Sequence, residues 1–168
     1  MDNQIYGLTK GQTSPSSAVG FVTKSTPKGN IEKNVAPLEL ALSSGATFVA
    51  QGFSSDIKAL TKMIEDAIHH DGFSFVNVFS PCVTYNKVNT YDWFKEHLTS
   101  IDDIEGYDIT DKQLAMKTVL DHESLVKGIV YQDTTTPSYE SQISELEHEA
   151  LAKRDIHITE ETFNDLTA

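Results

Sequence analysis

The 168-residue chain contains a single cysteine, Cys82. One thiol excludes an internal disulfide and argues against a small secreted domain built on disulfide bonds. The sequence also lacks a run of about 18 apolar residues, the length that a membrane-spanning helix needs. Its first residues have neither the basic lead nor the apolar core of a signal peptide. We therefore expect a cytoplasmic protein with no membrane partner.

Basic residues are scarce in the second half of the chain. Residues 90–168 carry six basic and eighteen acidic residues, whereas residues 1–89 carry seven of each, so the net charge of −12 lies in the second half. Nucleic acids and anionic membranes are polyanions that bind mainly to Lys and Arg, so neither is an expected partner. The simpler interpretation of the acidic half is a solvated surface. With 39% hydrophobic and 23% charged residues, the composition is that of an ordinary globular protein.

The pattern of the first forty-five residues predicts a long loop followed by a short helix. Residues 13–34 are rich in Ser, Thr, Pro, Gly and Lys and poor in apolar residues, which is typical of a loop, here expected over the active-site face. Pro37 suits the first turn of a helix and Gly45 is placed to stop it. We therefore expect a helix over residues 37–44.

A strand, a helix and a second strand are expected next. Residues 47–50 form a short β-favouring run, and the aromatic and β-branched run 73–79 predicts a buried strand. Between them, three residues offer alternative helix N-caps, namely Ser54, Ser55 and Asp56. Five apolar residues then share one helix face, namely Ile57, Leu60, Ile64, Ala67 and Ile68. This order predicts an α/β fold with a parallel sheet. Because ligands collect beyond the carboxyl ends of such strands, residues 3–12 and Cys82 should approach the same region.

The pattern changes after Asn86, where we expect the core to end. Residues 91–98 predict a helix that could pack on a neighbouring surface. Residues 125–131 could form a strand interrupted by Gly128, and residues 138–152 have apolar residues at helical spacing among glutamates.

Asn3 and Ile5 are candidate ligands of a metal ion. In an extended segment, alternate residues share a direction, so the Asn3 amide oxygen and the Ile5 carbonyl oxygen would lie on one side. Magnesium prefers such hard oxygen ligands and usually draws others from water and phosphate. Asp2 would face the opposite side, which disfavours it as a carboxylate ligand. From the spacing alone, a plain polar strand end is the simpler interpretation.

Two further side chains, Lys10 and Cys82, could carry chemistry. Taken alone, Lys10 is most simply an exposed loop lysine, and Cys82 a small buried apolar residue. The histidines show no metal-ligand spacing, and no arrangement of Ser, His and Asp typical of a catalytic triad is legible.

Four stretches in order resemble the beta subunit of 2-oxoacid:ferredoxin oxidoreductases. They are DNQIYGLTKGQTSPSS at 2–17, PLELALSSGATFVAQGF at 37–53, HHDGFSFVNVFSPCVTYN at 69–86 and YDWFKEHL at 91–98. A match of this length is far more specific than a short motif. The resemblance implies that residues 1–86 are the C-terminal part of a thiamine-diphosphate-binding domain and that residues 87–168 are a beta-subunit extension.

These enzymes oxidise 2-oxoacids to acyl-coenzyme A and pass the electrons to ferredoxin, so the resemblance implies an alpha subunit, ferredoxin, a 2-oxoacid and coenzyme A as partners. The sequence is most like the 2-oxoglutarate type, which forms succinyl-coenzyme A. In this family the cofactor carries the catalysis, and no catalytic side chain is expected.

The resemblance also assigns site residues. It implies that Asn3 and Ile5 bind Mg²⁺ on thiamine diphosphate, and that Tyr6 and Leu8 contact the cofactor. Lys10 would bind the substrate carboxylate. Cys82 would be the last of four thiolates on a 4Fe-4S cluster.

The sequence lacks the Gly-Asp-Gly motif and the three other cysteines that complete these sites in the family. All three cofactor sites are therefore incomplete in this chain, and we expect the chain alone to be inactive. Two alternatives stay open: a non-catalytic subunit-docking module, and the same chemistry on pyruvate or another 2-oxoacid.

Overall fold

The computed structural model of the chain describes residues 1–144, 151–153 and 157–167. The chain divides into two compact units, Met1–Thr136 and Pro137–Ala168. The first unit holds the sheet and all the candidate site residues.

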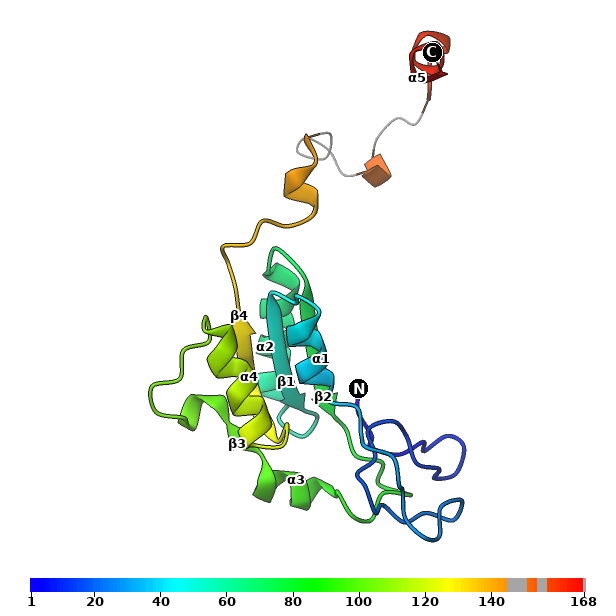
Figure 1. Cartoon of the computed structure of the whole chain (residues 1–168), viewed down its shortest axis with the longest axis vertical. Coiled ribbons are helices and arrows are strands. Elements are labelled where there is room, and N and C mark those ends of the chain that lie inside the picture. Colours follow the sequence, from blue (N-terminus) through cyan, green and yellow to red (C-terminus); the bar gives the residue numbers. More distant parts are fainter. Residues whose placement is uncertain (145–150, 154–156, 168) are drawn as a thin grey trace. The chain divides into compact units, whose positions relative to one another are not determined.

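The expected strand, helix and strand are present in the first unit (Figure 1). Helix α1 spans Pro37–Ser43, strand β1 Phe48–Phe53, helix α2 Ile57–His69 and strand β2 Ser74–Phe79. Of the three possible N-caps of α2, Asp56 is used, because its carboxylate accepts a hydrogen bond from the Ala59 N–H. Strands β1 and β2 pair in parallel, as the connection through α2 requires.

The chain then adds helix α3 at Tyr91–His97, strand β3 at Thr99–Ser100, helix α4 at Lys112–Asp121 and strand β4 at Val126–Gln132. In the described part, the strand order is β2-β1-β4-β3. The α/β fold is confirmed and the sheet is mostly parallel, since β1 pairs with β2 and β3 with β4 in that sense. Strand β4, however, runs antiparallel to β1, which the sequence pattern did not indicate.

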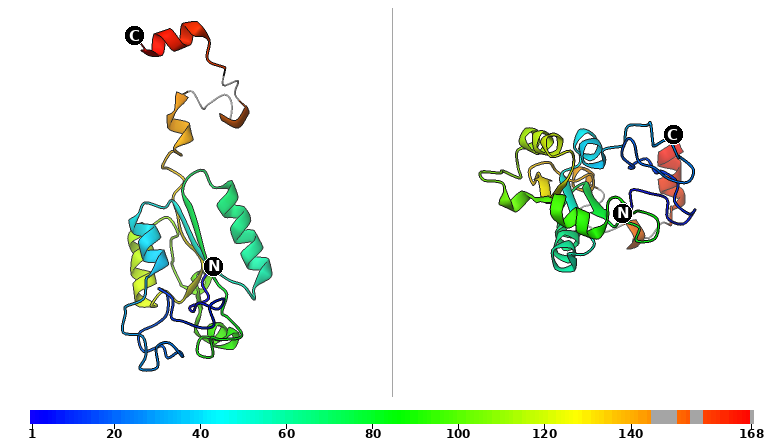
Figure 2. Two further views of the ribbon diagram at one scale, coloured as in Figure 1. Left: turned by 90° about the vertical axis from the view of Figure 1, so that its right-hand side faces the viewer. Right: turned by 90° about the horizontal axis from the view of Figure 1, so that it is seen from below.

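Helices cover both faces of the sheet in the first unit. Figure 2 shows α2 on one face and α1 with α4 on the other. The α1 and α4 side buries the larger core, which includes Leu42, Val49, Val119 and Val130. The α2 side buries Phe48 and two smaller neighbours in the same layer. The central strand β1 is buried along its whole length for this reason.

The expectation that the core ends near Asn86 is wrong. Strand β4 lies beside β1 inside the sheet, and α4 buries Ala115 and Val119 against α1. Helix α3 packs on the sheet strands of the same unit, because Phe94 is fully buried and its ring contacts those of Phe53 and Phe79. Truncating such a buried ring costs about 3–5 kcal/mol. The division at residues 86 and 87 stays a prediction about family segments.

The second unit contains short helical segments. They are a 3-10 turn at Glu140–Gln142, another at Leu151–Lys153 and helix α5 at Glu160–Thr167. The helix expected over residues 138–152 is wrong in its first part, because Ile143 is extended after the 3-10 turn. Residues 145–150 of that expected helix lie outside the described residues. No helix in the described ranges has the length and apolar character needed to cross a membrane.

Candidate functional site

The two candidate segments leave the sheet side by side. Asp2 forms a parallel bridge with Phe79, the last residue of β2. The Asp2 N–H donates to the Val78 carbonyl at 2.7 Å, and the Ser80 N–H donates to the Asp2 carbonyl at 2.9 Å. The residues that follow Asp2 and those that follow Phe79 therefore emerge at the same edge. This confirms that residues 3–12 and Cys82 approach one region.

Three contacts join the loop of residues 3–11 to the segment 82–86. The side-chain Nδ2 of Asn86 donates to the Asn3 carbonyl oxygen at 3.4 Å. A β-carbon built on Gly7 would stand 3.0 Å from the Cys82 Sγ, and one built on Gly11 would stand 3.2 Å from the Tyr85 ring. Gly11 also has a φ of +96°, which favours glycine. The loop can lie this close to the segment only because both positions lack a side chain.

Asn3 and Ile5 do not form the extended pair that the sequence indicated. Gln4 between them has a φ of 56°, so the chain turns at that residue instead of alternating. Both residues nevertheless line one hollow of about 410 Å³. Within the described residues, the Asn3 amide and the Ile5 carbonyl have no hydrogen-bond partner. Neither oxygen is occupied by a hydrogen bond, which is one condition for the predicted magnesium ligands.

The Asp2 carboxylate is already engaged. Asp2 is 9% exposed, and its Oδ1 accepts hydrogen bonds from the Gln4 N–H at 2.9 Å and the Ser16 hydroxyl at 2.6 Å. These bonds fix the start of the loop, which agrees with the view that Asp2 is not the carboxylate ligand. No cluster of three or more His, Cys, Asp or Glu side chains able to hold a metal exists among the residues that the structure describes. A complete magnesium site therefore needs a further anionic ligand.

Cys82 lies in a polar turn, and not in the apolar surroundings that its simplest interpretation suggested. The backbone amide of Tyr85, followed by those of Thr84 and Asn86, donates to the sulfur and lowers the pKa of the thiol. The positive charge of Lys87 acts in the same direction, while partial burial acts against it. Thiolate ligands of iron–sulfur clusters typically receive hydrogen bonds of this kind. The surroundings of Cys82 fit a thiolate ligand, although one thiolate does not hold a cluster.

Lys10 lies at the rim of a second hollow of about 410 Å³, and Lys24 lines the same hollow with the Tyr85 ring at its wall. No acidic side chain is among the lining residues, so the hollow is cationic. Lys10 is exposed, which keeps both the solvated and the substrate-binding interpretations open. Leu8 is fully exposed and Tyr6 is 51% exposed, and neither is enclosed by the residues around it.

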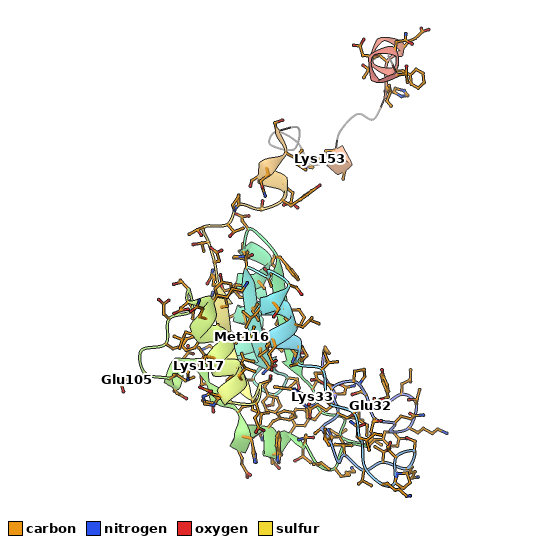
Figure 3. The ribbon with its side chains drawn as sticks, in the orientation of Figure 1. Glu32, Lys33, Glu105, Met116, Lys117 and Lys153 are labelled. Carbon is orange, nitrogen blue, oxygen red and sulfur yellow. The ribbon has the colours of Figure 1, made fainter. Side chains whose placement is uncertain are left out.

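A third hollow, of about 390 Å³, is lined in part by Tyr6. Glu32 and Lys33, labelled in Figure 3, line it together, so its charges are of both signs. The mixed charge distinguishes it from the hollow that holds Lys10 and Lys24. Neither Lys24 nor Asn86 was singled out from the sequence, because residues 13–34 and 83–86 carry no pattern beyond that of loops.

Comparisons with known proteins define the class of the domain. Residues 1–78 match the family described as "Thiamine pyrophosphate enzyme, C-terminal TPP binding domain". Residues 82–148 match the family of the C-terminal region of the pyruvate ferredoxin oxidoreductase beta chain. The two matches meet between Val78 and Cys82, at the edge of the sheet where the candidate site lies.

Relatives and a solved structure agree with these matches. The 2-oxoacid:ferredoxin oxidoreductase subunit beta of Sulfolobus is 40% identical over 152 residues, which are 84% of this chain and 50% of the relative. The 2-oxoglutarate oxidoreductase subunit KorB of Mycobacterium tuberculosis is 46% identical over 85 residues, 51% of this chain and 23% of that protein. The structure of 2-oxoglutarate:ferredoxin oxidoreductase from Magnetococcus marinus superposes with a TM-score of 0.82 at 30% identity, covering 99% of this chain and 56% of that one.

The chain belongs to the beta-subunit family of 2-oxoacid:ferredoxin oxidoreductases. It spans about half the length of curated relatives such as the Sulfolobus protein, of which it covers 50%. The resemblance stated from the sequence is thereby confirmed.

Proposed function

We propose that the chain supplies part of the thiamine-diphosphate site, and one thiolate of a 4Fe-4S cluster, in an enzyme that oxidatively decarboxylates 2-oxoglutarate and reduces ferredoxin. The observation that carries the proposal is the contact between the loop of residues 3–11 and the segment 82–86 at the edge of the sheet. Ligands of α/β proteins gather at such edges. The match of residues 1–78 to a TPP binding domain supports a thiamine-diphosphate site in this part of the chain.

Asn3 and Ile5 would hold Mg²⁺ through the side-chain and main-chain oxygens that have no other partner in the described structure. Tyr6 and Leu8 would contact the cofactor, and their exposed apolar surface would be covered by it. Thiamine diphosphate, when bound, supplies the nucleophile that attacks the keto carbon. What this chain adds is orientation of the diphosphate and removal of water from one side of the site.

Lys10 and Lys24 would bind the anionic substrate in the cationic hollow. 2-Oxoglutarate carries two carboxylates, and a hollow with two lysines and no acid suits a dianion better than it suits pyruvate. Among the relatives, the Mycobacterium tuberculosis protein is named for 2-oxoglutarate. The Magnetococcus marinus structure is described with 2-oxoglutarate, coenzyme A and succinyl-CoA bound. These names support 2-oxoglutarate and coenzyme A as substrates.

Cys82 would be one thiolate of the 4Fe-4S cluster, held by amide hydrogen bonds that favour its charged form. The cluster would pass single electrons to ferredoxin. As a beta subunit, the chain would act together with an alpha subunit, and we infer a cytoplasmic location for the assembly. The three further thiolates would come from outside this sequence, which has one cysteine, and the magnesium site would need an acidic ligand in addition to Asn3 and Ile5.

The test is magnesium-dependent binding of thiamine diphosphate to a complete beta subunit that contains this sequence, measured by calorimetry. Asn3→Ala should weaken binding by about tenfold or more, because an oxygen ligand is lost. The matched control is Asn34→Ala, an exposed asparagine in the same part of the chain. Equal affinities for the Asn3→Ala and control proteins would contradict the assignment.

The structure also offers support for a second candidate, the non-catalytic docking module. Strand β2 lies at one side of the sheet, and in the described residues its outer edge pairs only at the bridge to Asp2. On α2, Ile57, Ile64 and Ile68 follow one helix face and are 42–75% exposed. An open strand edge beside exposed apolar residues favours association with another polypeptide. Calorimetry on the isolated chain separates the two candidates, since submillimolar binding of thiamine diphosphate with Mg²⁺ would exclude a cofactor-free module.

A further inference from the structure

Asn86 touches both halves of the candidate site. It is 2% exposed, although it lies in a loop. Its Nδ2 donates to the Asn3 carbonyl at 3.4 Å, while its Oδ1 accepts from the N–H groups of Val88 at 3.1 Å and Asn89 at 2.9 Å. Its own N–H donates to the Cys82 carbonyl at 3.0 Å and closes the turn that carries the thiol. One side chain therefore links the start of the loop to the turn that carries Cys82.

The main-chain bonds of Asp2 hold the start of the loop, but between residues 3–11 and residues 82–86, all of which are described, the bond from Asn86 is the only hydrogen bond. Residues 1–36, all of which are described, form no helix or strand and have only the two isolated bridges Asp2–Phe79 and Tyr6–Gln12. The second bridge lies within the loop and does not attach it to anything. Gly7 and Gly11 contact Cys82 and Tyr85 without a side chain of their own, so these contacts permit close approach but do not direct it. The Asn86 amide is directional, because a hydrogen bond depends on angle as well as distance.

We propose that Asn86 is a positioning residue that fixes the distance between the metal-binding oxygens of residues 3–5 and the Cys82 thiol. The names of the bound groups rest on the proposed function, while the positioning itself is a property of this chain. The side chain bonds the main-chain oxygen of Asn3 and leaves the Asn3 side-chain oxygen available. A change at Asn86 should therefore displace the loop without removing any candidate ligand atom.

The two arms of the Asn86 amide can be tested separately in the 168-residue chain by hydrogen exchange of backbone amides. Asn86→Ser keeps a short acceptor for the Val88 and Asn89 N–H groups but removes the donor to Asn3. Asn86→Ala removes both. The reporters for the loop are the N–H groups of Tyr6 and Gly11, and the reporter for the turn is that of Asn89.

In Asn86→Ser the loop amides should exchange about two- to tenfold faster while the Asn89 amide stays protected, since one hydrogen bond is lost. In Asn86→Ala both sets should exchange faster. The matched control Asn34→Ser changes an exposed asparagine and should leave all of them unchanged. If Asn86→Ala does not fold, the Asn86→Ser comparison alone decides.

Unchanged loop exchange in Asn86→Ser would overturn the proposal. So would an equal rise in the amides of β1, because that would show a general structural role instead of positioning. A second measurement is a double-mutant cycle between Asn86→Ser and Gly7→Ala, which approach the same interface from its two sides. Non-additive effects on loop exchange are expected, and additive effects would contradict coupling. Neither readout involves a cofactor, so failure of the proposed function would leave these results standing.

Discussion

Gly7 lies so close to Cys82 that a β-carbon on Gly7 would stand 3.0 Å from the sulfur. The φ of Gly7 is not in the left-handed region, so an alanine could adopt its backbone and only space is lacking. Glycine is therefore needed at position 7 for lack of space and not for its backbone conformation.

Gly7→Ala should therefore move the loop away from the segment 82–86 and destabilise the chain by about 1–3 kcal/mol, the usual cost of overpacking. Denaturant unfolding of the two proteins measures this cost. The control is Leu8→Ala, because Leu8 is fully exposed and its truncation should change stability little. If Gly7→Ala is as stable as the unchanged chain, the Cys82 sulfur can move aside and the loop does not depend on glycine at position 7.

The Cys82 thiol should ionise at a lower pH than a free cysteine, because backbone amides, Tyr85 first, lower its pKa. The rate of alkylation by iodoacetamide, followed against pH, reports the thiolate fraction. The chain has one cysteine, so the signal needs no separation, and Cys82→Ser gives the background. A midpoint at or above that of a free cysteine would contradict the hydrogen-bonded turn.

Tyr107 should make the fold sensitive to alkaline pH. Burial raises its pKa to about 12, and its hydroxyl donates to the Val130 carbonyl at 2.6 Å. The unfolded chain loses this proton near the ordinary pKa of about 10, whereas the folded chain keeps it, so stability falls as pH rises from 10 towards 12.

Denaturant unfolding of Tyr107→Phe against the unchanged chain isolates this dependence, since both proteins retain Tyr131. The difference in stability between the two proteins should narrow across that pH window. Parallel curves throughout would show that Tyr107 ionises equally in both states.

Lys10→Ala, in a complete enzyme, should raise the Michaelis constant for 2-oxoglutarate by about tenfold, because a charge-assisted contact to a carboxylate is lost. Lys24→Ala should act in the same direction, as both lysines line one hollow. Lys33→Ala is the matched control, since Lys33 lines a different hollow beside Glu32 (Figure 3). An unchanged Michaelis constant in Lys10→Ala would remove Lys10 from the substrate site.

Local signals sufficed for much of the fold. Pro37 and Gly45 bracket α1, and Asp56 was among the caps expected for α2. These features depend on neighbouring residues and are visible in a linear sequence. Strand β4 was found but its direction was not, because antiparallel pairing with β1 depends on long-range contacts. Helix α4 was not predicted. Its apolar side chains are separated by polar ones, and only their packing against α1 identifies them as core residues.

The location of the candidate site could be predicted from the sequence, but its internal geometry could not. The length of the family match identified the loop of residues 3–12 and Cys82, and the parallel crossover predicted that they meet. The turn at Gln4 was not predictable, since a positive φ on a non-glycine residue is set by the bonds around it. The hydrogen bond from Asn86 to Asn3 was not predictable either, because it joins residues 83 positions apart in the sequence.

The proposed function depends most on Cys82, which lies beside the loop of residues 3–11 and is assigned as one thiolate of a 4Fe-4S cluster. The most direct measurement is the iron content and electron paramagnetic resonance spectrum of a complete beta subunit that contains this sequence, compared with its Cys82→Ser variant. The variant should lose the intact 4Fe-4S signal while keeping its fold, because a cluster needs its thiolate ligands. A full and stable cluster in the Cys82→Ser protein would contradict the assignment of Cys82 as a cluster ligand.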